Sequence, residues 1–296
     1  MHSMITVMDT RMLEYFVTVA DESNLTRAAE RLFVAQSTVS AGLRSLEREL
    51  GVRLFERSTK AVSLLPAGEA LLPIARDVLD GIDALLSTAN ESGLGLRGRV
   101  RVGTFAALLV FDLPGVLGRF RRDHAGVDVQ LMTSATGSTG LLDDLLRGRL
   151  DLAFVALPVP PGLEAVPVVR RPFVALVPLD HPLAGRDEVS LTDLADEDWI
   201  DVLPGFGNRV QLDARLAELG IVRRLSAEVA DLPSVASFVA AGVGIAVVPD
   251  AIDSAGCRVI ALSDDLPDWV VSLAVRRGGE RNRAIQAFAD ALRDAT

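Results

Sequence analysis

The chain has 296 residues, 49% of them hydrophobic, and carries a net charge of −10. This length and apolar content predict about two globular domains and exclude a disordered chain, and no apolar stretch reaches the roughly 18–20 residues of a membrane-spanning helix. The single cysteine, Cys257, excludes an internal disulfide and a thiolate metal cluster. The histidines show no ligand spacing and the first residues show no signal peptide. We therefore expect a cytoplasmic protein without a metal site.

Residues 27–60 depart from the overall acidity. This segment holds seven basic and four acidic side chains, a net charge of +3. A local basic segment in an acidic chain indicates a surface for an anionic partner such as DNA.

Three helices are predicted within the first fifty residues, because apolar residues recur at helical spacing over 13–20, 25–32 and 39–50. Only three residues separate the second helix from the third, so the two must cross sharply, as in a helix-turn-helix. The exposed face of the third helix suits base edges and phosphates in a major groove. The residues of this predicted recognition face are Gln36, Ser37, Thr38, Ser40 and Arg44.

Two short alternating segments follow, at 52–57 and 58–64, and predict a β-hairpin wing. Arg57 and Lys60 lie near the tip of this hairpin and Arg53 lies in its first strand. We expect these three residues, with Arg44, to contact phosphates. The alternative is a three-helix core whose polar face only meets water.

The order of residues in this region resembles the signature of the LysR family of transcriptional regulators. The match runs through LTRAAERL at 25–32, QSTVS at 36–40, LERELGVRLFER at 46–57 and PAG at 66–68. The resemblance implies a winged helix-turn-helix that binds double-stranded operator DNA, and Arg27 joins the predicted contacts. Ala41 and Gly42 stand where the family often carries larger polar side chains. Operator preferences of relatives therefore do not transfer to this chain.

A long helix is predicted next, with apolar residues spaced 4, 3, 4, 3 and 4 apart, as in a helix that pairs along its length. These residues are Leu71, Ala75, Val78, Ile82, Leu85 and Ala89. The alternative is a helix that packs only on its own domain. The LysR resemblance implies that this linker helix joins a homodimer, and that two dimers form a homotetramer through their sensor domains.

From residue 99 onward, strands alternate with helices, which predicts parallel sheets. Two α/β lobes, with the chain crossing between them twice, resemble the type 2 periplasmic-binding-protein fold of LysR sensor domains. The fold class is thus α/β overall. The predicted domains are a winged helix-turn-helix at 1–66, a linker helix at 67–93 and an effector domain at 94–296. Within the effector domain we expect the first lobe at about 97–158 and 269–296, and the second at about 159–268.

Ligands of open α/β sheets bind beyond the carboxyl ends of strands, at helix N-termini. This rule predicts an effector site at Thr104, Phe105, Ala106, Gly137, Ser138, Thr139, Pro204, Gly205, Phe206 and Asn208. Ser138 resembles the family position whose hydroxyl or amide meets the effector, although it could equally cap its helix. Arg209 is the one residue near these loops that could bring a full positive charge to them. We therefore expect a small effector that is neutral or carries one negative charge.

No pattern of an enzyme emerges. The stretch Gly137–Gly140 is not a nucleophile elbow, and Gly242 and Gly244 lack the remainder of a dinucleotide fingerprint. We therefore expect a non-enzymatic, LysR-type transcriptional regulator without a cofactor, whose partners are operator DNA, a small-molecule effector, further copies of itself and RNA polymerase. The alternative is a stand-alone small-molecule-binding protein or a transferase on the same two-lobe fold.

Overall fold

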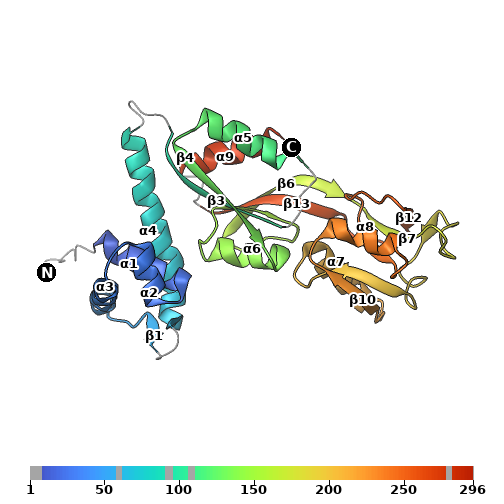
Figure 1. Ribbon diagram of the computed structural model, residues 1–296, viewed down its shortest axis with the longest axis horizontal. Coiled ribbons are helices and arrows are strands. Elements are labelled where there is room, and N and C mark those ends of the chain that lie inside the picture. The colour runs from blue at the N-terminus through green and yellow to red at the C-terminus, as the bar shows by residue number, and fades with distance from the viewer. Residues whose placement is uncertain (1–8, 58–61, 91–95, 106–110, 278–281, 296) are drawn as a thin grey trace. The chain divides into compact units, whose positions relative to one another are not determined.

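The computed structural model describes residues 9–57, 62–90, 96–105, 111–277 and 282–295. The chain divides into two compact units, Met1–Gly95 and Leu96–Thr296, each with its own hydrophobic core (Figure 1). Within the described ranges, no helix is both long and apolar enough to cross a membrane. The same residues contain no cluster of His, Cys, Asp or Glu side chains that could hold a metal ion.

The N-terminal unit contains the three short helices, the hairpin and the long helix that the sequence predicts. Its elements are α1 (Thr10–Glu22), α2 (Leu25–Arg31), α3 (Gln36–Leu50), β1 (Phe55–Arg57), β2 (Val62–Leu64) and α4 (Pro66–Asn90). The strands β1 and β2 are antiparallel, with Phe55 opposite Leu64. They are shorter than the predicted segments, and residues 58–61, including Lys60, lie outside the described residues.

The ends of the first helices follow from local hydrogen bonds. The side chain of Asp9 accepts a hydrogen bond from the amide of Arg11 at 3.0 Å and starts α1. Asn24 accepts from the amides of Thr26 and Arg27 and starts α2. Gly51 ends α3 with a φ of +70°, a conformation that glycine adopts without strain.

The core of the N-terminal unit joins these helices to the wing and to α4. The rings of Phe16 and Phe55 meet edge to face, with their centroids 5.6 Å apart. The carboxylate of Glu47 in α3 accepts a hydrogen bond from the amide of Leu54 at 2.9 Å, just before β1. A Cβ at Gly68 would lie 2.3 Å from the carbonyl oxygen of Leu54, so glycine allows α4 to start directly against the wing.

The second unit consists of two lobes. The sheet of the first lobe has the order β4-β3-β5-β13-β6, in which β4, β3 and β5 are parallel and β13 and β6 are antiparallel to their neighbours. Figure 1 shows α5 and α9 together on one face of this sheet and α6 on the other. The elements of this lobe are β3 (Gly98–Phe105), α5 (Leu113–Asp123), β4 (Val127–Ser134), α6 (Gly137–Leu146), β5 (Leu152–Val155), β6 (Leu163–Arg171), β13 (Trp269–Arg276) and α9 (Arg283–Arg293).

The second lobe holds a four-stranded sheet of order β11-β7-β12-β8 and the parallel pair β9 and β10. A bridge between Trp199 and Ile245 connects the two. Its elements are β7 (Phe173–Pro178), β8 (Glu188–Val189), β9 (Asp198–Val202), α7 (Gly207–Glu218), β10 (Arg224–Val229), α8 (Leu232–Ala240), β11 (Ala246–Pro249) and β12 (Cys257–Leu262). The chain passes between the lobes twice, from β6 to β7 and from β12 to β13, as the fold predicts.

The lobe boundary differs from the expectation. The sequence places residues 159–171 in the second lobe, but β6 pairs with β13 along its whole length in the first-lobe sheet. The first lobe therefore extends to about Arg171. The strands β6, β8 and β12 were not predicted, because none of them shows strict alternation of buried and exposed residues over a useful length.

Candidate DNA-binding and effector sites

The predicted recognition face lies on α3. Gln36, Ser37 and Thr38 occupy its first turn and are exposed, and a guanidinium nitrogen of Arg44 donates a hydrogen bond to Oγ of Ser40 at 2.9 Å. The N-cap residue of α3 is Ala35, which has no side-chain acceptor for the first-turn amides. Amides without such an acceptor, at the positive end of a helix dipole, are suited to a phosphate oxygen.

The other predicted DNA contacts are spread around α3. Arg27, in α2, forms an ion pair with Glu22 at 3.6 Å and remains largely exposed. A guanidinium nitrogen of Arg53 donates to the carbonyl oxygen of Phe55 at 3.4 Å, beside the wing. The backbone of Arg57 ends β1, but its side chain lies outside the described part of the chain, as does Lys60.

The structure explains the glycine inside α3. A Cβ at Gly42 would lie 2.5 Å from Cδ2 and 2.8 Å from Cε2 of Tyr15, so the ring of Tyr15 packs against the backbone of α3. Tyr15 and Arg11 of α1 line a groove beside the recognition face. Neither residue was predicted as part of a site; the unusual glycine at position 42 was the one signal in the sequence.

The predicted pairing seam of α4 divides into two parts. Leu71 and Ala75 pack within the core of the N-terminal unit. Val78 and Leu85 are exposed, at 44% and 69%, and Ile82 is half-buried; Ile74, which was not predicted as part of the seam, is exposed at 57%. The side chain of Ala89, the last seam position, lies outside the described residues. The exposed part of the seam is a row of large apolar side chains at helical spacing.

The predicted effector loops meet between the two lobes. The amide and the hydroxyl of Thr139 both donate to the carbonyl oxygen of Gly205, each at 3.1 Å. A Cβ at Gly137 would lie 2.8 Å from Cα of Phe206, and one at Gly207 would lie 2.2 Å from the carbonyl oxygen of Ala156. We call residues 136–139 and 204–208, with Thr104 and Phe105, the lobe junction. Ala106 lies outside the described residues.

Ser138 has a structural partner in the lobe junction. It is buried, and its Oγ accepts a hydrogen bond from the amide of Ala156 at 2.9 Å. The N-cap of α6 is Thr136, so Ser138 does not cap this helix with its side chain. Its hydroxyl instead fixes the chain that leaves β5 against the start of α6.

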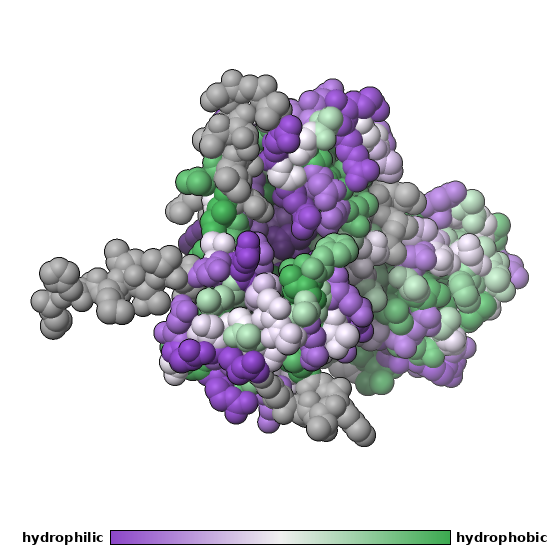
Figure 2. Space-filling model, turned by 60° about the vertical axis from the view of Figure 1, so that its left-hand side comes forward, coloured by the Kyte–Doolittle hydropathy of each residue, from purple (hydrophilic) through white to green (hydrophobic). Residues whose placement is uncertain are grey.

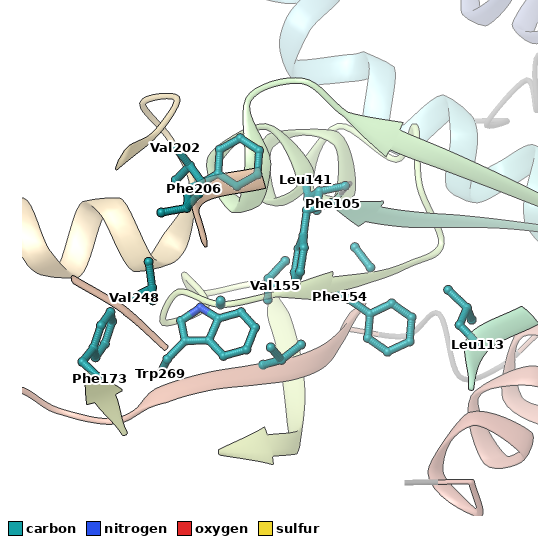
Figure 3. Close-up of a cluster of buried hydrophobic side chains, with 14 of the residues drawn as sticks. Phe105, Leu113, Leu141, Phe154, Val155, Phe173, Val202, Phe206, Val248 and Trp269 are labelled. Carbon is teal, nitrogen blue, oxygen red and sulfur yellow. The ribbon is translucent and has the colours of Figure 1, made fainter. Parts of the chain in front are cut away.

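Two buried nitrogen donors near the lobe junction have no hydrogen-bond acceptor. They are Nδ2 of Asn208 and Nε1 of Trp269, and both residues are at least 96% buried. The rings of Trp269 and Phe105 meet edge to face with their centroids 6.1 Å apart, and Figure 3 shows them in one cluster with Phe206 and Phe173. Apolar walls with a few placed polar groups are typical of small-molecule sites.

Arg209 does not supply a free charge to the lobe junction. Its guanidinium donates to the carbonyl oxygen of Val202 and to Glu228, each at 2.7 Å, and to Asp213 at 3.1 Å. Burial disfavours the charged form, but Glu228, Asp201 and Asp213 outweigh this effect and raise the pKa of Arg209. The expectation that Arg209 could offer its charge to an effector is therefore wrong, because Asp213, one turn along α7, and Glu228 of β10 both pair with its guanidinium.

The same network holds a second buried arginine. Arg223 donates to Asp201 at 2.6 Å and to Asp213, and its guanidinium lies 5.6 Å from the centroid of the Trp199 ring. Burial raises the pKa of Asp201, and the charges of Arg223 and Arg209 counteract that rise.

Comparison with known proteins places this geometry in a family. The model of the bacterial regulatory helix-turn-helix proteins of the LysR family matches residues 10–69, and that of the LysR substrate-binding domain matches residues 93–296. The uncharacterized HTH-type transcriptional regulator YnfL of Escherichia coli is 32% identical over 249 residues, 81% of this chain and 82% of that protein. A probable hydrogen peroxide-inducible genes activator of Streptomyces viridosporus is 31% identical over 293 residues, 96% of this chain and 93% of that protein.

A solved structure extends this similarity to the whole chain. A point variant of full-length OxyR from Pseudomonas aeruginosa superimposes with a TM-score of 0.73 at 29% identity, over 100% of this chain and 97% of that one. Both family models and these relatives agree with the winged helix-turn-helix and the two-lobed α/β unit described above. The chain belongs to the LysR family and is a DNA-binding transcriptional regulator with an effector-binding domain.

Proposed function

We propose that α3 enters the major groove of an operator and that the wing and neighbouring arginines bind the adjacent phosphates. The observation that carries this proposal is the exposed N-terminus of α3, where the first-turn amides have no side-chain cap and stand beside Gln36, Ser37 and Thr38. The helix thus combines donors for a phosphate with short side chains for base edges.

A gel-shift titration with DNA from upstream of the gene tests this proposal. Arg44→Ala and Arg57→Ala should weaken binding to all sequences and each lower the slope of log K against log salt by about 1. Gln36→Ala and Ser40→Ala should instead change which sequence is preferred. Arg293→Ala, in α9 of the other unit, is a control that leaves the salt slope unchanged. Equal slopes for the wild type and all the arginine variants would refute the assignment.

We further propose that a small neutral or singly charged molecule binds at the lobe junction and modulates operator binding or promoter activation. The buried donors of Asn208 and Trp269 suit one or two hydrogen-bond acceptors, and the aromatic rings suit an apolar body. The pairing of Arg209 with three carboxylates argues against a multiply charged anion.

Thermal-shift measurements with small carboxylic acids, amides and ketones test the effector proposal, with citrate and tripolyphosphate as multiply charged controls. A ligand that stabilises the wild type should stabilise Asn208→Leu and Trp269→Phe less, since each variant removes a donor. Operator affinity without ligand should stay the same in both variants. Stabilisation by tripolyphosphate would overturn the charge argument.

We also propose that α4 joins two copies of the chain, that the dimers pair into a tetramer, and that the assembly acts on RNA polymerase in the cytoplasm. The exposed apolar residues Ile74, Val78 and Leu85 support the dimer. Figure 2 shows that hydrophobic residues are interspersed with hydrophilic ones on one face of the molecule. Ile82→Asp should dissociate the dimer, because it places an unpaired charge in an apolar seam. Ile82→Leu is the matched control. An unchanged mass of Ile82→Asp in light scattering would refute the role of α4.

A further inference from the structure

A groove with a volume of about 540 Å³ lies between α1 and α3. Its walls are formed by Asp9, Arg11, Met12 and Tyr15 from the side of α1, and by Ser37, Thr38, Ala41, Gly42 and Ser45 of α3. No side chain that α3 contributes is larger than threonine. The groove exists because Gly42 lets the ring of Tyr15 lie against the helix backbone and because Ala41 does not reach across it.

The groove is continuous with the recognition face. Residues of an α-helix follow one another at about 100° around its axis, so Gln36, Ser40 and Arg44 form one stripe, and Thr38 and Gly42 face the groove. Ser37 and Ala41 lie between the two, opposite the buried residues of α3, and Ala41 is exposed. Any DNA that contacts the polar stripe therefore meets Ala41 and the rim of the groove.

The groove contains apolar surface that the polar stripe lacks, beside the hydroxyls of Ser37 and Ser45 and the side chain of Arg11. Ala41 and Thr38 offer methyl groups, and Tyr15 and Met12 offer apolar surface. The carboxylate of Asp9 is engaged as the cap of α1, where it accepts from the amide of Arg11. Among the bases in a major groove, only thymine presents a methyl group, and alanine and threonine methyls are its usual apolar partners.

We propose that this groove receives the 5-methyl group of an operator thymine, and that Ala41 and Thr38 are specificity-determining residues for a T·A pair at that position. Tyr15 is the wall against which the methyl group packs, and Gly42 is required to hold that wall in place. The inference rests on the proposed entry of α3 into the major groove. It assigns a base preference to Thr38 and to Ala41, a position at which this chain carries a smaller side chain than the family often does.

Replacing thymine by uracil in the bound DNA tests the proposal, because it removes the methyl group and leaves the base pair intact. Each thymine of the protected region is replaced in turn, and affinity is measured by titration. One thymine per half-site should show a loss of about fourfold, the effect of one buried methyl group. At that position, 5-methylcytosine should bind better than cytosine.

If the wild type binds its upstream DNA but no uracil substitution changes affinity by more than about twofold, the methyl contact is wrong while operator binding stands. Failure to bind that DNA at all would refute the proposed function instead.

Variants of Ala41 identify the residue that reads the methyl group. Ala41→Gly removes the contact, and the ratio of affinities for thymine and uracil at the sensitive position should fall to about 1. Glu49→Gly, an exposed position in the last turn of α3, introduces the same helix-destabilising residue and should keep the wild-type ratio. Ala41→Ser retains the helix if Ala41→Gly folds poorly, and should also lower the ratio. A wild-type ratio in both Ala41 variants would overturn the assignment.

Discussion

Gly42 lies inside a helix although glycine has a low helix propensity, because the residue must leave room for a neighbouring side chain. Glycine inside a helix costs about 1 kcal/mol relative to alanine, but the ring of Tyr15 occupies the space of a Cβ at this position. Gly42→Ala should therefore lower the free energy of unfolding by about 1 kcal/mol, since overpacking outweighs the gain in helix propensity.

Gly118 in α5 provides the matched control. A Cβ there would meet its nearest neighbour, a nitrogen of Arg122, at an ordinary 3.7 Å. Gly118→Ala should thus raise the free energy of unfolding. Urea unfolding of Gly42→Ala and Gly118→Ala measures both changes. A stabilised Gly42→Ala protein would show that the ring of Tyr15 moves away freely.

Ser138 shows what the sequence could not reveal at this scale. The position next to Gly137 was predicted from the strand and helix pattern, and the structure brings it to the lobe junction. The partner of its hydroxyl, the amide of Ala156, lies 18 residues away and could not be read from spacing. Removal of the hydroxyl would leave a buried amide without an acceptor, at a cost of about 1–3 kcal/mol. Asn208 and Trp269 are therefore cleaner positions for testing the effector.

At the scale of elements, α7 is tied to β9 and β10 by buried ions. Asp201 of β9 is 1% exposed and pairs with Arg223, which directly precedes β10, and with Arg209 of α7. Asp201→Asn keeps the shape of the side chain but removes the charge opposite two arginines. The variant should lose about 1.5–3 kcal/mol in the free energy of unfolding at neutral pH, because the buried guanidinium of Arg223 loses its hydrogen bond to a charged carboxylate.

Glu218→Gln is the control for this prediction. It breaks the exposed pair of Glu218 with Arg215 on the same helix and should change stability by no more than about 0.5 kcal/mol. Urea unfolding of the two variants separates the cases. Equal stability of Asp201→Asn and the wild type would show that the buried pairs add nothing beyond their own desolvation.

Most elements could be predicted because their periodicity is local. The helices predicted over 13–20, 25–32 and 39–50 correspond to α1, α2 and α3. The strand β6 escaped prediction because Pro167 interrupts it and its exposed residues do not alternate. Its assignment depends on the pairing with β13, which lies about a hundred residues later in the chain.

For the whole molecule, the single thiol bears on how the chain senses its signal. Some relatives are named hydrogen peroxide-inducible genes activators. Cys257 is half-buried and its thiol donates to the carbonyl oxygen of Ala236 at 3.2 Å. Burial raises the pKa of Cys257, which favours the thiol over the reactive thiolate at neutral pH.

We therefore expect hydrogen peroxide to leave operator affinity unchanged. Alkylation of native Cys257 by iodoacetamide should be slow at neutral pH and should accelerate as the pH rises toward the raised pKa of the thiol, while the chain unfolded in urea should react faster at neutral pH. Gel shifts with and without peroxide, and mass spectrometry of the alkylated chain, provide the two measurements. A peroxide response that disappears in Cys257→Ser would contradict this expectation.

The change of sequence pattern near residue 95 predicts two units, but the contacts between loops in the lobe junction could not be predicted. Those contacts depend on how the two lobes close, which no local sequence pattern indicates. The free charge expected of Arg209 was wrong for a different reason, since Glu228, 19 residues later in the chain, pairs with it within the second lobe.

The contact between Thr139 and Gly205 has a consequence for the sensitivity of the regulator. The carbonyl oxygen of Gly205 already accepts hydrogen bonds from the amide and the hydroxyl of Thr139. An effector that accepted hydrogen bonds from Thr139 would therefore compete with this carbonyl. Its apparent dissociation constant would equal the intrinsic one divided by the fraction of molecules in which this contact is open. The concentration at which the protein responds would then be set partly by the strength of an internal contact. Substitutions that weaken the contact between Thr139 and Gly205 would lower the concentration of effector at which the protein responds.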